Sequence, residues 1–260
     1  MTARMEAHLP GWLPPPSITA ILLAPFMGSF LGVLVRRLPD GRPVALGRSA
    51  CESCGHVLGA RDLVPFASYL WLRGRCRFCA APIAPAHFAI EAASLAIAIV
   101  AALVDGPDET RVWAGCALGW TLLALAWIDW THMRLPDALT LPLVPVGLAA
   151  TWVLDPDAIA DHAAAAALGY LAFRLIAAAY RWRRKREGLG QGDAKLLAAA
   201  GAWVGLSGLP DVMLGGAIIG LAVAGARWLR GERVGADTAL PFGPCLAAAT
   251  WLVWLGVRLA

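Results

Sequence analysis

Residues 112–129 read VWAGCALGWTLLALAWID, an apolar run that ends in an aspartate. A transmembrane helix needs roughly 17–25 mostly apolar residues, so this run is long enough to cross a bilayer. Of the 260 residues 59% are hydrophobic and 15% are charged, whereas about a quarter are charged in a soluble domain. We predict an all-α polytopic membrane protein with about eight transmembrane helices, in the segments Ile18–Val35, Ala86–Val104, Val112–Ile128, Ala138–Leu154, His162–Tyr180, Ala194–Leu206, Asp211–Leu229 and Leu240–Leu259.

The loops between these segments differ in charge. Arginines dominate the loops at 36–85, 181–192 and 227–237, while those at 105–111 and 155–161 are acidic. Because basic loops stay in the cytoplasm, we expect the N-terminus outside and residues 129–137, 188–193 and 235–243 together at the cytoplasmic face. We divide the chain into 1–35 (N-terminal segment and first span), 36–85 (cytoplasmic four-cysteine loop) and 86–260 (seven-span core).

Two cysteine pairs lie in the first loop. Cys51-x-x-Cys54 and Cys76-x-x-Cys79 are separated by 21 residues, a spacing typical of a four-thiolate zinc ribbon. Two disulfides or four free thiols are the alternatives, and a cytoplasmic loop argues against disulfides. A closed site of four protein ligands predicts a structural zinc, which would stabilise a loop too small to form its own hydrophobic core.

Four acidic residues lie at or inside the apolar segments, where an ionisable group is costly and indicates function. Asp129 ends the third segment, at the helix end where a negative charge is unfavourable. Asp193 begins the sixth segment and Glu91 lies inside the second. For Asp137 in Leu135-Pro136-Asp137 we favour helix capping, and Asp193 has the same alternative.

The stretch GLGQGD at 188–193 places three glycines before Asp193. Glycines let another backbone come close, so Gly188, Gly190 and Gly192 predict an edge for an extended peptide. The stretch lacks the spacing of nucleotide-binding loops. Two carboxylates brought together at a wet membrane rim would push their pKa values apart, so that one activates water while the other protonates the leaving amine. This is aspartic-peptidase chemistry without a metal.

These features are similar to a known family. The chain resembles the type IV prepilin peptidases, bifunctional membrane aspartyl peptidases of the GxGD class. The resemblance rests on GSFLGVLVRRLP at 28–39, the CxxC pairs with LRGRCR at 72–77, Ile128-Asp129 followed by LPD, GQGD at 190–193 with Lys195, and PFGP at 241–244. It extends along nearly the whole chain.

The resemblance implies cleavage, after a glycine, of the basic leader of type IV prepilins and type II secretion pseudopilins at the cytoplasmic face of the bacterial inner membrane. It implies catalysis by Asp129 and Asp193, and N-methylation of the new terminus with S-adenosylmethionine. Lipid and these substrates are the expected partners, and no nucleic acid is expected. The supporting residues that we expect are Gly190, Gly192, Lys195, Glu91, Asp137, Pro241 and Gly243.

Three positions depart from the family pattern. Gly32 stands where asparagine is common, Ala86-His87-Phe88 where a Tyr-Pro pair precedes the glutamate, and Arg75 where lysine often occurs. From their similar depths we suggest that Glu91 pairs with Arg174. Three alternatives stay open: a peptidase without methylation, a transporter or proton relay, and an inactive scaffold of pilus assembly.

Overall fold

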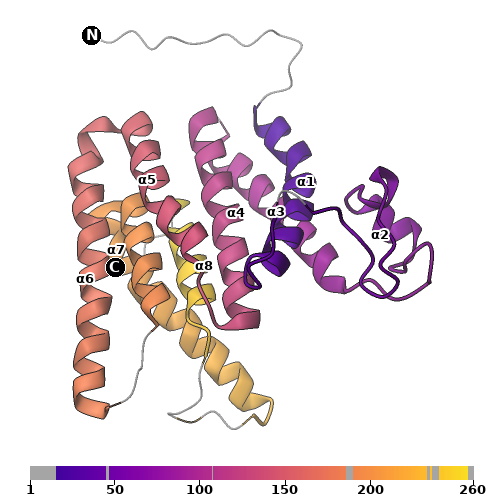
Figure 1. Cartoon of the computed structure of the whole chain (residues 1–260). Coiled ribbons are helices and arrows are strands. Elements are labelled where there is room, and N and C mark those ends of the chain that lie inside the picture. Colours follow the sequence, from indigo (N-terminus) through magenta and orange to yellow (C-terminus); the bar gives the residue numbers. More distant parts are fainter. Residues whose placement is uncertain are drawn as a thin grey trace.

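The computed structural model describes residues 16–44, 47–106, 108–185, 190–232, 235 and 240–256. Within these ranges every regular element is helical, and β-pairing is limited to two isolated bridges in the cysteine loop. Figure 1 shows the long helices side by side, with the cysteine loop and its short helix α2 (Ala67–Trp71) projecting from one edge. The all-helical prediction is therefore confirmed for the described residues.

Three helices form the N-terminal half of the bundle: α1 (Pro16–Arg37), α3 (Pro85–Asp105) and α4 (Glu109–His132). They share one apolar core that includes Leu31, Ile90 and Ile128. Buried Ser94 joins all three, because its hydroxyl donates to the Ala24 carbonyl of α1 and its backbone carbonyl accepts the indole N–H of Trp120 from α4. Satisfying polar groups across helices in this way is what an apolar solvent demands.

Four helices form the other half: α5 (Asp137–Leu154), α6 (Ile159–Arg184), α7 (Gln191–Leu229) and α8 (Gly243–Trp254). Helices α6 and α7 come so close that a Cβ on Gly201 would lie 2.4 Å from the Ala165 carbonyl oxygen. Small residues allow this close packing between membrane helices. Trp203 completes the core: it packs edge-on against Trp254 and donates its indole N–H to the Leu143 carbonyl.

Helix α7 contains a break at Gly205, whose φ of 71° and ψ of −177° are not helical. Asp161, at the start of α6, accepts the N–H of Leu206 just beyond the break. The break reverses the chain, because Gly208 lies against Val253 near the end of α8 while Gly220 lies against Phe242 just before its start. Both ends of α7 therefore lie toward the end of the bundle where α8 starts (Figure 1).

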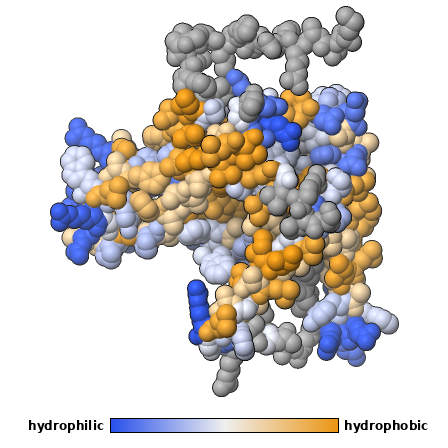
Figure 2. Space-filling view, turned by 180° about the vertical axis from the view of Figure 1, so that it is seen from behind, coloured by the Kyte–Doolittle hydropathy of each residue, from blue (hydrophilic) through white to orange (hydrophobic). Residues whose placement is uncertain are grey.

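Among the residues that the structure describes, six helices are long and apolar enough to cross a membrane: α1, α3, α4, α5, α6 and α7. Helix α8 is apolar but has only 12 residues. The predicted sixth and seventh segments lie on the two sides of the break in α7, and the count of eight spans stays a prediction. In Figure 2 apolar side chains cover much of the body, and hydrophilic ones gather on the projecting loop and at the lower helix ends.

Candidate active site

Asp129 lies near the end of α4, and its side chain is buried at 6% exposure. Its Oδ2 accepts the backbone N–H of Gly243 at 3.0 Å. Gly243 is the first residue of α8, where backbone N–H groups have no partner within the helix. A Cβ at this position would lie 2.7 Å from the same oxygen, so only glycine lets the N–H approach. The C-terminal end of α4 disfavours the negative charge of Asp129, and the N-terminal end of α8 offsets this by favouring it.

Asp193 lies in the first turn of α7 and is also buried, at 9% exposure. Its Oδ2 accepts the N–H of Gly190, the N-cap residue, at 3.1 Å. The alternative that Asp193 serves as the N-cap residue was therefore wrong in position, because Gly190 is the N-cap. Asp193 still takes part in capping, since it accepts a backbone N–H from within the first turn. Gly188, the first glycine of the predicted hook, lies outside the described residues.

The two aspartates come from helices far apart in sequence, yet Gly243, which binds Asp129, and Gly192, which precedes Asp193, both lie against Leu135. Leu135 holds the neighbouring backbones together: a Cβ on Gly192 would lie 2.8 Å from its Cβ, and one on Gly243 would lie 3.2 Å from its Cδ2. In the described part of the chain no donor binds Oδ1 of either aspartate. The arrangement can place two carboxylate oxygens toward one reacting group.

Lys195 and Asp137 join α7 to α5 beside this pair. Lys195 Nζ lies 2.5 Å from Asp137 Oδ1, and the two side chains are 27% and 57% exposed. The prediction that Asp137 caps its helix was wrong, because Pro136 is the N-cap and no side-chain cap bond forms. Asp137 instead neutralises the lysine, and the half-exposed pair leaves Asp129 as the buried acid of this segment.

The remaining predicted positions near the pair are Pro241 and Gly243. Pro241 lies just before α8, whose N-cap is Phe242. The ring of Phe242 packs against Gly216 and Gly220 of α7. The PFGP stretch therefore sets the start of α8, and with it the N–H that binds Asp129. The glycine and prolines of this stretch indicated an irregular backbone, but they did not show that one of its N–H groups would bind Asp129.

The four predicted metal ligands converge. The sulfur atoms of Cys51, Cys54, Cys76 and Cys79 lie within 4.8 Å of one another, and those of Cys51 and Cys79 are 3.8 Å apart. A tetrahedral zinc with Zn–S bonds near 2.3 Å requires sulfurs about 3.8 Å apart. Backbone N–H groups of Cys54 and then Ser53 lower the pKa of the Cys51 thiol to about 6, while, against a bond from the Ala81 backbone, burial and the neighbouring thiols raise the pKa of Cys79 to about 12. Of these two thiols, Cys51 thus loses its proton more readily.

The local backbone explains the convergence. Each pair forms the same turn: Gly55 donates to the carbonyl of Cys51, and Ala80 donates to that of Cys76. Both donors have positive φ, 70° and 56°. Each turn is closed by an isolated antiparallel bridge. Two matching turns facing each other can hold a metal ion, which confirms the metal-binding capacity of the loop.

Glu91 has a different partner from the one we suggested. Its carboxylate is buried at 8% exposure, and Oε2 accepts the N–H of Phe66 in the cysteine loop at 2.9 Å. Arg174 lies exposed on α6 and forms no ion pair with it. The suggested Glu91–Arg174 pair was therefore wrong. Glu91 lines a cavity against the loop, and its link to Phe66 had no signal in the sequence.

A helical membrane fold, two buried carboxylates at helix ends and a four-thiolate centre define a polytopic membrane protein with the parts of an aspartic peptidase. Residues 22–104 match the model of the bacterial peptidase A24 N-terminal domain, and residues 116–225 match that of the type IV leader peptidase family. The chain belongs to the type IV leader peptidase family.

Curated relatives are similar to this chain along most of its length. It is 40% identical to the prepilin leader peptidase/N-methyltransferase of Burkholderia pseudomallei (strain K96243), over 88% of this chain and 82% of the relative. Proteins of the same name from Aeromonas hydrophila and Pseudomonas aeruginosa are each 35% identical, covering 90% and 92% of this chain and 88% and 89% of their own lengths. No solved structure matches the chain.

Proposed function

We propose that this protein is a prepilin leader peptidase that also N-methylates the new terminus of its product. Its substrates are type IV prepilins and type II secretion pseudopilins, cleaved after a glycine at the cytoplasmic face of the bacterial inner membrane, with the protein's N-terminus outside. The observation that carries the proposal is the approach of Asp129 and Asp193, buried and anchored by backbone N–H groups. The names of the relatives supply the substrate class.

In the proposed reaction one aspartate is ionised and removes a proton from water, which adds to the carbonyl carbon of the scissile bond. The other aspartate is protonated and polarises the carbonyl oxygen. The C–N bond then breaks, and the leaving amine takes up a proton from the pair. Two close carboxylates favour the shared-proton state that this division requires. The N–H of Gly243 orients Asp129, so that its second oxygen faces the reaction.

Neighbouring residues support the substrate. Gly190 and Gly192 begin α7 without side chains beside Asp193, so an extended leader can lie against this backbone. The Lys195–Asp137 pair holds the starts of α7 and α5 at a constant separation. The cysteine loop takes a structural zinc through Cys51, Cys54, Cys76 and Cys79. When bound, S-adenosylmethionine supplies a methyl group that replaces a proton of the terminal amine, leaving a neutral thioether.

The proposal is tested by mixing the purified full chain with a prepilin-type substrate and following product masses. Asp129→Asn and Asp193→Asn should each abolish cleavage, while Asp137→Asn should retain it, since Asp137 is already paired with Lys195. Cleavage that survives in Asp129→Asn and is lost in Asp137→Asn would move the catalytic role to Asp137. Normal pilus assembly by cells carrying the double asparagine variant would instead support the scaffold alternative.

A further inference from the structure

A cavity of about 670 Å³ lies between α1, α3 and the cysteine loop. Its wall includes Ser29, Val33 and Arg36 of α1, His87 and Glu91 of α3, and Tyr69 of α2. Cofactor pockets commonly measure about 300–1,000 Å³ and combine apolar walls with a few convergent polar groups. Neither Asp129 nor Asp193 is part of this wall, so the cavity is separate from the proposed peptidase site.

Glu91 gives the cavity a negative charge. Among the described residues no lysine or arginine forms an ion pair with it, and its hydrogen-bond partners are neutral: the N–H of Phe66 and the hydroxyl of Ser29. Phe66 has a φ of 58° and a ψ of −53°, which is rare for a residue with a side chain. Buried carboxylates without a counter-charge are costly. A cation in the cavity would offset that cost.

Aromatic rings lie around the same space. Phe88 and Tyr69 both line the cavity, and their ring centres are 5.3 Å apart. Phe26 and Phe30 line it from α1 and are 59% and 47% exposed. Aromatic faces attract cations and stack on flat ring systems. The lining therefore suits a ligand that combines a positive charge with a planar aromatic group.

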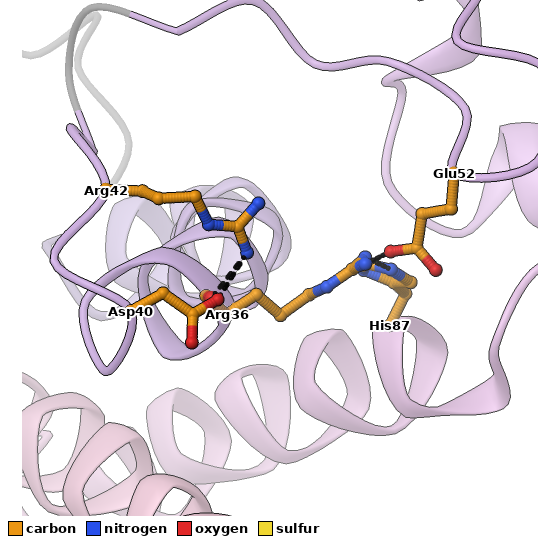
Figure 3. A network of polar contacts seen from close by, with 5 residues as sticks. All are labelled: Arg36, Asp40, Arg42, Glu52 and His87. Atoms are coloured by element: carbon orange, nitrogen blue, oxygen red, sulfur yellow. Dashed lines mark hydrogen bonds and ion pairs between the residues drawn. The ribbon is translucent and has the colours of Figure 1, made fainter.

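Arg36 adds a positive charge to the same wall, beside His87 (Figure 3). Its guanidinium lies 2.7 Å from His87 Nε2 and forms an ion pair with Glu52. Because arginine only donates, His87 accepts at Nε2 and is neutral, with its proton on Nδ1. His87 precedes Glu91 by one turn of α3, about 6 Å along the axis. Arginine has five N–H donors, so Arg36 can also hold a ligand carboxylate.

Two departures from the family pattern meet at this point. A Cβ on Gly32 would lie 3.3 Å from His87 Nδ1, a tight contact. Glycine at position 32 therefore makes room for the imidazole at position 87. The imidazole of His87 fills the space beside α1 and fixes the direction of Arg36. The two departures, Gly32 and His87, thus lie next to each other in one wall of the cavity.

We propose that this cavity binds S-adenosylmethionine, with Glu91 facing the sulfonium and Arg36 facing the ligand's carboxylate. The sulfonium is the cation that Glu91 lacks, the adenine is the planar group for the aromatic wall, and a short carbon chain separates sulfonium from carboxylate. The proposal rests on the proposed N-methylation. Ile128, adjacent to Asp129, shares a core with Leu31 of α1 and Ile90 of α3, so the two sites lie on the same part of the bundle.

The test compares the equilibrium binding of S-adenosylmethionine and of S-adenosylhomocysteine, which lacks the positive charge. Full-length, zinc-loaded protein is used as wild type, Glu91→Gln, Val33→Trp and, as a control, Asp157→Asn, an exposed carboxylate on the η2 turn. Glu91→Gln should weaken the methyl donor at least about tenfold and the neutral analogue less than about threefold. Val33→Trp fills the cavity and should weaken both ligands, and Asp157→Asn should weaken neither.

Leader cleavage and zinc content are measured on the same samples. We expect cleavage to persist in the wild type, Val33→Trp and Asp157→Asn, since neither change touches the aspartate pair. Unchanged donor binding in Glu91→Gln, or in Val33→Trp if Glu91→Gln loses its fold, would overturn the proposal. A wild type that cleaves leaders but binds neither ligand would overturn it as well and leave the peptidase standing. A wild type that binds the donor but cleaves no leader would overturn the peptidase function and leave the cavity proposal standing.

Discussion

Gly243→Ala tests the geometry of the aspartate pair without touching a carboxylate. The new Cβ would lie 2.7 Å from Asp129 Oδ2 and 3.1 Å from its Cγ. Real Cβ contacts are not this short, so the carboxylate or the start of α8 must shift. The hydrogen bond from the Gly243 N–H, now 3.0 Å long, is then lost or bent.

The size of the effect follows from that bond. A hydrogen bond to a charged group contributes about 1.5–3 kcal/mol, which corresponds to a loss of roughly 10–150-fold in rate if the bond orients the reacting carboxylate. We expect the loss in kcat for leader cleavage, with KM nearly unchanged, because the change lies at the carboxylate and away from the glycine edge of α7.

Gly225→Ala is the matched control, since a Cβ there meets nothing within 4 Å and alanine favours a helix over glycine. Both variants are assayed for cleavage of one prepilin substrate and for thermal unfolding in the same detergent. Gly243→Ala with a kcat within about threefold of wild type would refute the role of this N–H. An equal loss in both variants would refute it too, because the effect would then not depend on Asp129.

Three further predictions concern other parts of the chain. The double change Cys51→Ser and Cys54→Ser removes two of four thiolates, so metal analysis should find zinc lost; full retention would contradict the zinc site. Gly205→Ala places a Cβ 2.5 Å from an Asp161 oxygen at a φ of 71°, so the melting temperature should fall, and an unchanged value would show that the break is not strained by a side chain. Lys195→Met breaks a half-exposed pair worth about 0–1 kcal/mol, so kcat/KM should fall less than about tenfold; a larger loss would give Lys195 a role in the reaction itself.

Much of the candidate site was predictable because its residues are exceptions to an apolar background. An aspartate that ends a long apolar run, as Asp129 does, is conspicuous at a membrane boundary. Two CxxC pairs predict a metal site because each pair forms its own turn, and the structure brings those turns together. The family resemblance held over most of the chain for the same reason: its motifs are local.

What failed was the assignment of partners. The sequence suggested Arg174 for Glu91 and helix capping for Asp137, while the structure gives Phe66 and Lys195. Depth along a helix does not say which helices are neighbours, and α3 and α6 belong to different halves of the bundle. The end of an apolar run placed the break at Gly205 within one residue, but it did not show that the chain reverses direction at this glycine.

The sequence by itself determined that the protein is embedded in a membrane, that it is helical, that each cysteine pair forms a turn and which acidic residues lie at the ends of or inside the apolar segments. These features depend on composition and on short spacing along the chain. Only the tertiary structure decided that Gly243 supplies the N–H for Asp129 across 114 positions, that Leu135 joins the two glycine motifs, and that a cavity forms against the cysteine loop. Those features depend on which helix faces meet. Helix packing settles that through the close approach of small residues, which no single segment encodes.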